Sequence, residues 1–432
     1  MTGLQRLFIT GTGIALGLLT ACHTSQQAQH TSVNPQTEQI QDLAQVVTPQ
    51  KAVNKVTPVA PRSFTSVERM AIRLDSLMND PFLTRTQMGF YVYDLTDNRP
   101  IYERGKEQRM RPASTMKVLT AVTALAQLGE NYSYSTPLFI DGKIKGNKLH
   151  GNLYVRGGFD PSFDRKGINA FVNALAQRGI RRIQGHLIVD LSMKDDKEAG
   201  MGWCWDDKNP SLSPLLYNGK DAFGTNFIKA LQNKGIMISN KTTTGRVPAT
   251  AELVYNHKTG ISKILEPMMK ESVNQDAESM FYQIAAQGNK PYANRKDAER
   301  YIKQFINEAL QLNADNYFIA DGSGLSLYDY LTPELLVTAL KYAYGHPGIY
   351  NPLLLSLPIA GIDGTLEKRL IGTAAYRNVR AKTGTVTGIC SLAGYATASN
   401  GHLLCFAIIN QGQKRSSEAR IFQDKVCRIL TE

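Results

Sequence analysis

The chain has 432 residues, of which 42% are hydrophobic, and a formal net charge of +12 at pH 7. This length predicts two domains, or one domain with a large insertion, and the apolar content is sufficient for a full core. No apolar run after residue 21 is long enough to span a membrane. Because no long basic run carries interleaved aromatic residues, we expect no nucleic-acid partner. The positive charge instead favours contact with anionic lipid or an acidic polymer.

The N-terminus predicts an export signal. A short apolar stretch runs from Leu7 to Leu19, which is the length of a signal-peptide core rather than a membrane span. Small residues then lead to Cys22, as in bacterial lipoprotein signals. We therefore expect residues 1–21 to be removed and Cys22 to carry lipid that holds the protein to a bacterial membrane. An ordinary secretory signal with an incidental cysteine is the alternative. Residues 22–62, rich in Gln, Thr, Ser and Pro, predict a flexible tether.

The segment after the tether predicts a helix, a hairpin and a second helix. Apolar residues recur at helical spacing over residues 65–79, behind a Thr/Ser cap. Residues 88–95 are rich in strand-forming residues, and a turn then leads to a second strand that begins at Ile101. Residues 117–128 are apolar on most sides, which predicts a buried helix.

The character of the sequence changes at about residue 137, where short strand-like runs alternate with Gly and Asn. We interpret residues 141–254 as an inserted domain of mixed α and β structure. The predicted strands cover residues 137–140, 152–155, 185–190, 235–239 and 252–255, and the predicted helices residues 167–178 and 224–234.

The remaining sequence predicts four helices, three strands and a final helix. The helices cover residues 261–270, 276–286, 297–312 and 333–344, the strands residues 378–385, 388–397 and 403–410, and the final helix residues 416–430. An Asn-Gly turn joins the last two strands. Strands from both ends of the chain with helices between them predict an α+β fold, in which residues 63–140 and 255–432 form one antiparallel sheet with helices on both faces.

The pair Ser114 and Lys117 is the first candidate for chemistry. Residues three apart share one helix face, so the lysine amine can reach the serine hydroxyl. A buried lysine with a lowered pKa can take the proton of a serine, which makes the serine a nucleophile. The alternative is that Ser114 only caps the helix while Lys117 points to water.

Two later motifs could complete a site. Ser272-Val273-Asn274 offers a hydroxyl and an amide from a loop between helices, with helix capping as the alternative. Lys382-Thr383-Gly384-Thr385 lies on a predicted strand and suits a carboxylate, although an exposed edge lysine is the alternative. Each motif also occurs a second time, at residues 32–34 and 258–260, so a three-residue motif by itself is weak evidence for a catalytic site. The order Ser-x-x-Lys, Ser-x-Asn, Lys-Thr-Gly favours the later copies.

This trio of motifs occurs in penicillin-binding proteins and β-lactamases. Beyond the trio, the chain resembles the class C low-molecular-mass penicillin-binding proteins, the D-Ala-D-Ala carboxypeptidases and endopeptidases of peptidase family S13. The resemblance covers almost everything after the tether. The matching stretches, in family order, are residues 111–117, 157–161, 272–279, 321–326, 361–366 and 381–395. The resemblance implies the fold of that group, with an antiparallel sheet flanked by helices and a smaller insertion.

The resemblance also implies a role for each matching residue. Ser114 would be the acylated nucleophile, Lys117 its general base, and Ser272 a proton relay to the leaving amine. Asn274 would orient Lys117 and the substrate amide. Lys382 would keep the site positive. Thr383, Gly384 and Thr385 would bind the terminal carboxylate of the peptide, and the backbone N–H groups of Ser114 and Thr385 would form the oxyanion hole.

The chain departs from the family pattern at a few positions. Val273 stands where Asp is usual, Phe159 replaces a third glycine, Leu327 stands where Arg is common, and Asp329 stands where Asn is usual. None of these positions belongs to the residues with proposed chemistry. Val273 and Leu327 therefore affect the details of substrate recognition more than activity.

The resemblance predicts a serine-type D-Ala-D-Ala carboxypeptidase that acts on peptidoglycan stem peptides and is inhibited by β-lactams, with D,D-endopeptidase activity as an additional expectation. A β-lactamase and a catalytically inactive wall-binding lipoprotein are the alternatives. We expect no cofactor, and no metal site, because the seven histidines show no metal-ligand spacing. Export permits disulfides, but the sequence does not select a pairing of Cys204, Cys390, Cys405 and Cys427.

Overall fold

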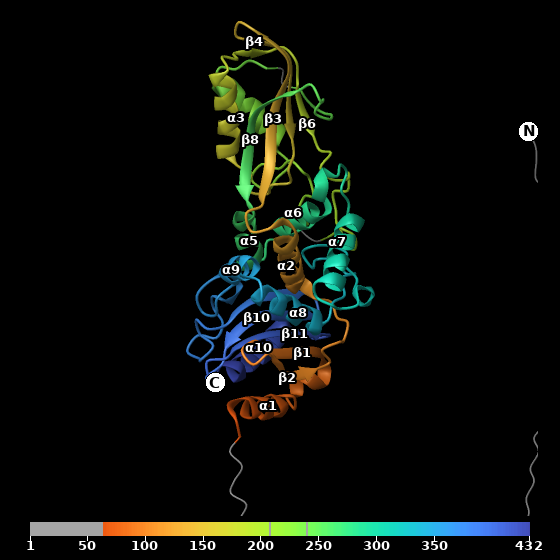
Figure 1. Cartoon of the computed structure of the whole chain (residues 1–432), viewed down its shortest axis with the longest axis vertical. Helices are drawn as coiled ribbons and strands as arrows, with labels where there is room; N and C mark the ends of the chain where they lie inside the picture. Colours follow the sequence, from red (N-terminus) through yellow and green to blue (C-terminus); the bar gives the residue numbers. More distant parts are fainter. Residues whose placement is uncertain (1–63, 207–208, 239–240) are drawn as a thin grey trace, which may run out of the picture. The chain divides into compact units, whose positions relative to one another are not determined.

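The computed structural model describes residues 64–206, 209–238 and 241–432, and residues 63–432 form one compact unit (Figure 1). The expected signal peptide, Cys22 and the whole of the expected tether, residues 22–62, lie outside the described residues. No helix in the described ranges has the length and apolarity needed to cross a membrane.

The first sheet has five antiparallel strands in the order β2-β1-β11-β10-β9, which confirms the expected antiparallel sheet made from both ends of the chain. Its strands are β1 (Gln87–Asp94), β2 (Arg99–Arg104), β9 (Arg380–Val386), β10 (Ile389–Thr397) and β11 (Leu403–Gln411). The N-terminal hairpin therefore pairs with the C-terminal strand, so the sheet forms only when the two chain ends meet.

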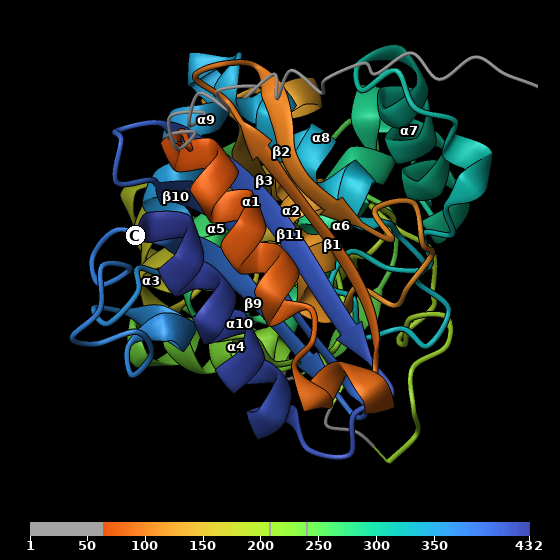
Figure 2. The same ribbon diagram turned by 90° about the horizontal axis from the view of Figure 1, so that it is seen from below.

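Helices cover both faces of this sheet, and successive side chains of a strand serve opposite faces. Phe90 and Val92 of β1 pack in one cluster with residues of α1 (Ser66–Leu77) and α10 (Ser416–Thr431), which lie side by side in Figure 2. Tyr91 and Tyr93 join the opposite cluster, which contains α2 (Met116–Leu128) and α8 (Pro333–Tyr344). Burial on both faces explains why β1, β10 and β11 are mostly apolar, whereas the edge strand β2 is partly exposed.

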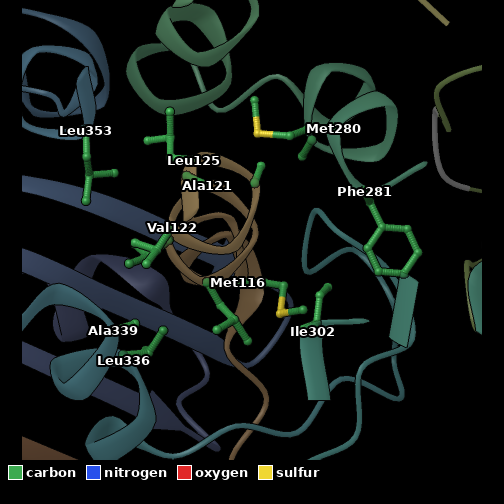
Figure 3. Packing of buried hydrophobic residues seen from close by; sticks show 14 of the residues in the cluster. Met116, Ala121, Val122, Leu125, Met280, Phe281, Ile302, Leu336, Ala339 and Leu353 are labelled. Atoms are coloured by element: carbon green, nitrogen blue, oxygen red, sulfur yellow. The ribbon is translucent and has the colours of Figure 1, made fainter. Parts of the chain in front are cut away.

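Helix α2 is the centre of the larger core, as its apolar sequence predicts. Figure 3 shows its side chains, among them Val122 and Leu125, surrounded by residues of α6 (Asn274–Ala285), α7 (Arg295–Glu308), α8 and α9 (Pro347–Ser356). Its first ten residues are buried, including Lys117. A fully buried helix holds its N-terminal end, where Ser114 lies, in a fixed position.

A second, six-stranded sheet is formed by residues that come between β2 and β9 in the sequence. Its order is β7-β6-β4-β3-β8, with β5 beside β4. Its strands are β3 (Ser133–Lys145), β4 (Lys148–Arg156), β5 (Arg182–Ile183), β6 (Leu187–Asp190), β7 (Thr242–Thr244) and β8 (Glu252–Gly260). Helices α3 (Arg165–Gln177) and α4 (Phe223–Asn233) share a core with it. The long strand β3 begins before residue 141, and the long strand β8 ends after residue 254.

The secondary structure differs from the sequence prediction at several places, among them the short strands β5 and β7, which were not predicted. Helix α9 was not predicted, because two prolines within a short segment favour a turn. The expected strand at residues 235–239 is wrong for its described part, where only Met237 forms an isolated bridge. The helix predicted at 297–312 ends as α7 at Glu308, whereas α5 (Ile261–Lys270) has the predicted limits.

None of the cysteines in the described ranges forms a disulfide. Cys390, Cys405 and Cys427 are buried, as small apolar residues often are. Burial raises the pKa of the Cys427 thiol to about 12, which leaves it unreactive.

Candidate active site

Ser114 lies in a short 3₁₀ turn, η2 (Ala113–Thr115), directly before α2. Ala113 has a φ of 47°, in the left-handed region that residues with a side chain seldom adopt. Gly324 allows a neighbouring loop to approach this turn, since a Cβ there would lie 1.8 Å from the Ala113 carbonyl oxygen. Ser391 on β10 donates a hydrogen bond of 2.6 Å to the Pro112 carbonyl. The sheet and the loop together therefore fix the position of Ser114.

Lys117, on the first turn of α2, is fully buried, and its ammonium has three acceptors. Its Nζ lies 3.0 Å from Ser114 Oγ, 2.8 Å from Asn274 Oδ1 and 2.8 Å from the Ser323 carbonyl oxygen. Burial lowers the pKa of Lys117 to about 8, although nearby carboxylates, Asp321 first among them, act in the opposite direction. About a tenth of the lysine is then neutral at pH 7 and able to accept a proton.

Asn274 and Ser272 come from the junction of α5 and α6. Asn274 is the first residue of α6, so its side chain is directed by a buried helix toward Lys117. Ser272, in the turn before it, has a φ of 62°. Backbone strain at both Ala113 and Ser272 is typical of positions where function dictates the conformation. Helix capping does not account for the pair, because Val273 is the cap residue and makes no side-chain cap hydrogen bond.

Lys382 lies on β9, at the edge of the first sheet, and is fully buried rather than exposed. Its Nζ donates to Ser272 Oγ at 2.9 Å and to the Thr383 carbonyl at 2.8 Å. Burial and the positive charge of Lys117 lower the pKa of Lys382 well below its ordinary value. The two buried lysines repel each other, so the site favours one ammonium over two.

Gly384 lets strand β9 pass directly beside Ser114. A Cβ at this position would lie 2.2 Å from Ser391 Oγ and 2.9 Å from the backbone nitrogen of Ser114. Only glycine fits such an approach. The other copy of the motif, residues 258–260, also lies on a strand, at the end of β8, but there Thr259 donates to Asp160. Location on a strand therefore does not distinguish the two copies, whereas proximity to Ser114 does.

The motifs meet at a cleft of 480 Å³. Ser114, Ser272, Thr383 and Thr385 line it, so sequence segments more than 250 residues apart share one wall. The sequence analysis assigned no role to several other lining residues, although four of them lie in the matching stretches 361–366 and 381–395. These other lining residues are Gly364, Thr365, Glu367, Lys368, Arg369, Cys390, Ser391 and Arg420. The Thr383 hydroxyl donates to Thr365 Oγ1 at 2.7 Å, and the nearby cations favour an anionic ligand.

Comparison with known proteins identifies the group to which this site belongs. The model of the D-Ala-D-Ala carboxypeptidase 3 (S13) family matches residues 70–215 and 216–432. The chain belongs to this family. It is a serine D-Ala-D-Ala carboxypeptidase of the penicillin-binding-protein group and an extracytoplasmic enzyme, and the expected family is confirmed.

Individual relatives agree with this assignment. The D-alanyl-D-alanine carboxypeptidase DacB of Haemophilus influenzae is 26% identical over 74% of this chain and 84% of the relative. The D-alanyl-D-alanine carboxypeptidase of Actinomadura is 25% identical over 83% and 84%. The crystal structure of penicillin-binding protein 4 from H. influenzae has a TM-score of 0.74 at 24% identity over 82% of this chain and 97% of that chain. This structural likeness confirms the expected fold.

Beneath Lys117, the carboxypeptidase has a cluster of buried acids that the sequence analysis did not assign a role. Asp321 accepts four N–H donors, whereas burial and the Asp321 charge raise the pKa of both Glu278 and Asp329 well above their ordinary values. The raised pKa values make Glu278 and Asp329 harder to ionise than ordinary carboxyl groups. The matching stretch 321–326 pointed to this loop, but only the structure connects it to Lys117.

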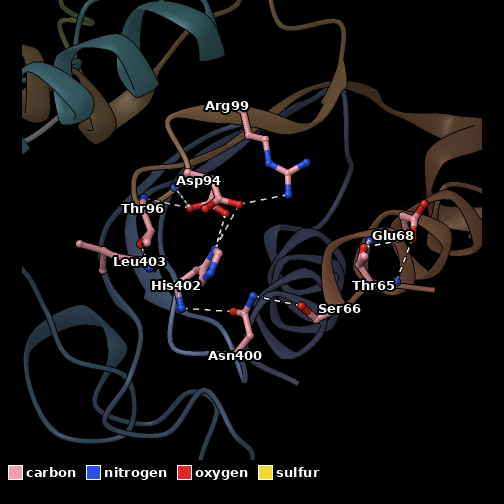
Figure 4. Close-up of polar contacts among 10 residues, drawn as sticks. Thr65, Ser66, Glu68, Asp94, Thr96, Arg99, Asn400, His402 and Leu403 are labelled. Atoms are coloured by element: carbon pink, nitrogen blue, oxygen red, sulfur yellow. Dashed lines mark hydrogen bonds and ion pairs between the residues drawn. The ribbon is translucent and has the colours of Figure 1, made fainter. Parts of the chain in front are cut away.

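The prediction that the enzyme has no metal site stays a prediction. Asp94, Asp97 and His402 have ligand atoms close enough to hold an ion at the end of the β1–β2 hairpin (Figure 4). Their atoms already have partners, however. Asp94 accepts the backbone N–H groups of Thr96 and Asp97 and lies 2.8 Å from His402 Nδ1, and Arg99 pairs with Asp97. The hydrogen bond to Asp94 raises the pKa of His402, which favours an ion pair.

Proposed function

We propose that this carboxypeptidase removes the terminal D-alanine from peptidoglycan stem peptides through an acyl-enzyme on Ser114, and that the same chemistry extends to D,D cross-bridges. The observation that carries the proposal is the 3.0 Å contact between Lys117 Nζ and Ser114 Oγ, with Asn274 and Ser323 holding the amine in line. A serine becomes nucleophilic when a positioned base removes its proton, and a buried amine of lowered pKa can do so at neutral pH.

In acylation, neutral Lys117 takes the hydroxyl proton as Ser114 Oγ attacks the carbonyl carbon of the penultimate residue. The backbone N–H groups of Ser114 and Thr385 stabilise the resulting oxyanion. The close approach of β9 at Gly384 supports this role. Lys117 then returns the proton, which Ser272 relays to the nitrogen of the departing D-alanine. Water hydrolyses the ester and regenerates Ser114.

Recognition of the free peptide terminus would fall to β9. A terminal carboxylate needs hydrogen-bond donors and positive charge, and Thr383 and Thr385 offer hydroxyls in the cleft beside Lys382. Binding of this carboxylate favours the charged form of Lys382, whose pKa the empty site lowers. Substrate binding thus restores the positive charge that we expect Lys382 to supply.

The replacement Ser114→Ala tests the nucleophile. It should abolish both covalent labelling by penicillin and release of D-alanine from a muropeptide pentapeptide. Ser399 is exposed, so Ser399→Ala serves as the matched control and should retain both penicillin labelling and D-alanine release. Labelling that persists in Ser114→Ala would exclude Ser114 as the nucleophile.

Two measurements separate this function from its alternatives. A carboxypeptidase forms a penicilloyl-enzyme that persists long enough to be seen by mass spectrometry, whereas a β-lactamase turns penicillin over rapidly. An inactive wall-binding lipoprotein would release no D-alanine from the pentapeptide.

We also propose that Cys22 carries a lipid that anchors the enzyme to a bacterial membrane, and that residues 141–254 form an inserted domain. The apolar run that ends in small residues before Cys22 supports the first proposal. The variant Cys22→Ser should move from the membrane fraction to the soluble extract and should no longer incorporate radioactive palmitate. Unchanged membrane association and palmitate incorporation would contradict the anchor.

A further inference from the structure

The segment between β6 and α4 reaches back to the catalytic residues. Three of its residues bind the loop formed by residues 321–327, here called the Asp321 loop. Ser326 Oγ donates to the Met201 carbonyl at 2.7 Å, and the Leu327 N–H donates to the Gly202 carbonyl at 3.1 Å. Trp203 Nε1 donates to Asp321 Oδ2 at 2.9 Å. The segment thus holds the loop through two backbone carbonyls and one indole.

Asp321 organises its own loop. The side chain is 1% exposed, and it accepts the backbone N–H groups of Ser323, Gly324 and Ser326 at 2.6–3.0 Å. Among the described residues, Trp203 supplies the fourth N–H donor, and the other three donors belong to the loop itself. Hydrogen bonds to a charged acceptor are stronger than those between neutral groups, so the indole fixes Asp321 firmly.

The Asp321 loop in turn holds both members of the nucleophile pair. The Ser323 carbonyl accepts the Lys117 ammonium at 2.8 Å, and Gly324 packs against the Ala113 carbonyl beside Ser114. A chain of direct contacts therefore runs from Trp203 through Asp321 and the loop backbone to Lys117. A small displacement along such a chain misaligns the base, and misplacement by about 1 Å can cost about a hundredfold in rate.

We propose that Trp203 is a positioning residue for acylation: its indole N–H anchors Asp321, and the Asp321 loop thereby aligns Lys117 with Ser114. This inference rests on the proposed role of Lys117 as the base. It makes the rate of the chemical step depend on a residue that does not line the cleft and belongs to the segment between β6 and α4.

The charges around Lys117 give the proposal a second readout. Asp321, Glu278, Asp276 and Asp329 face its amine and raise its pKa, and Asp321 has the largest effect of the four. The neighbouring Lys382 is buried, and its own pKa is lowered by burial and by the charge of Lys117. Without the indole donor, Asp321 is held less firmly beside Lys117. Its attraction for the Lys117 ammonium weakens, so the pKa of Lys117 falls.

The chain offers a matched pair of variants, because it contains two tryptophans. Trp203→Phe keeps an aromatic ring but removes the N–H donor, whereas Trp205 is 94% exposed and Trp205→Phe is the control. Stopped-flow acylation by penicillin, measured from pH 6 to 9, separates noncovalent binding from the chemical step. In Trp203→Phe we expect the maximal acylation rate to fall at least tenfold and the dissociation constant of the noncovalent penicillin complex to stay the same. The rise of the acylation rate with pH should move to lower pH. Trp205→Phe should match the wild type in all three.

Several results would overturn the proposal. A wild-type acylation rate in Trp203→Phe would do so. So would a slower rate with an unchanged pH profile and a proportionate loss of folded protein, because that pattern indicates a purely structural role. If Trp203→Phe does not fold, Ser326→Ala removes another contact with the segment and should slow acylation in the same way. Failure of the proposed function is distinguishable, since it would appear as labelling of Ser114→Ala.

Discussion

The role of Lys117 as general base makes a quantitative prediction about pH. With a pKa of about 8, the neutral fraction of the lysine is about one tenth at pH 7 and about nine tenths at pH 9. The second-order rate constant for acylation by penicillin should therefore rise about tenfold over this interval. In Lys117→Arg the rising limb should disappear, because a guanidinium stays charged throughout, and the rate at pH 9 should fall by about 10²–10⁴. Stopped-flow measurement at several pH values provides the test.

Lys194 provides the control for this experiment. It is also a buried lysine of lowered pKa, and its Nζ donates to the carbonyls of Asp195 and Lys197, outside the cleft. Lys194→Arg should show the same rise of the acylation rate constant around pH 8 as the wild type. A flat wild-type profile, or an acylation rate in Lys117→Arg close to that of the wild type, would refute the assignment of Lys117 as the base.

Three further predictions follow from the site. Gly384→Ala places a Cβ 2.2 Å from Ser391 Oγ, an overpacking that costs about 1–3 kcal/mol, so acylation should slow at least tenfold; normal acylation would show that β9 can move away from Ser114. Thr383→Val should raise KM for a pentapeptide more than for its C-terminal amide, and equal effects would argue against carboxylate binding. Burial raises the pKa of Asp276 from 3.8 to about 7, so the folded state binds more protons than the unfolded state between these values and loses stability as pH rises. Urea denaturation should show Asp276→Asn gaining up to about 4 kcal/mol over the wild type between pH 4 and pH 8, whereas a pH-independent difference would contradict the raised pKa.

Most elements of the fold were predictable because their signals are local. The periodicity of residues 65–79, the apolar strands at both ends of the chain and the Asn-Gly turn gave the elements α1, β1, β10 and β11 within one or two residues. The missed helix α9 illustrates the limit. It contains two prolines, and its formation is explained by packing against α5, α8 and α2, which no local pattern records.

The candidate site shows the same division. Motif order selected Ser114, Lys117, Ser272, Asn274 and Lys382, and the structure brings these five together. Sequence reasoning did not find the groups that hold them. Ser323, Ser391 and Trp203 act through a carbonyl, a hydroxyl and an indole that lie far away in the chain, and such residues carry no spacing signal.

The sequence by itself determined the chemistry available to this protein: a serine with a lysine three residues later, two further motifs in family order, and enough apolar residues to bury a helix between them. Tertiary structure alone decided the electrostatics. Lys117 and Lys382 are both fully buried, and a buried charge depends on every neighbour that replaces water. For Lys117 those neighbours include Asp321 and Glu278, and for Lys382 they include Lys117. All of them come from distant parts of the chain. The sequence therefore names the base, but only the packed structure sets the pH at which it can act.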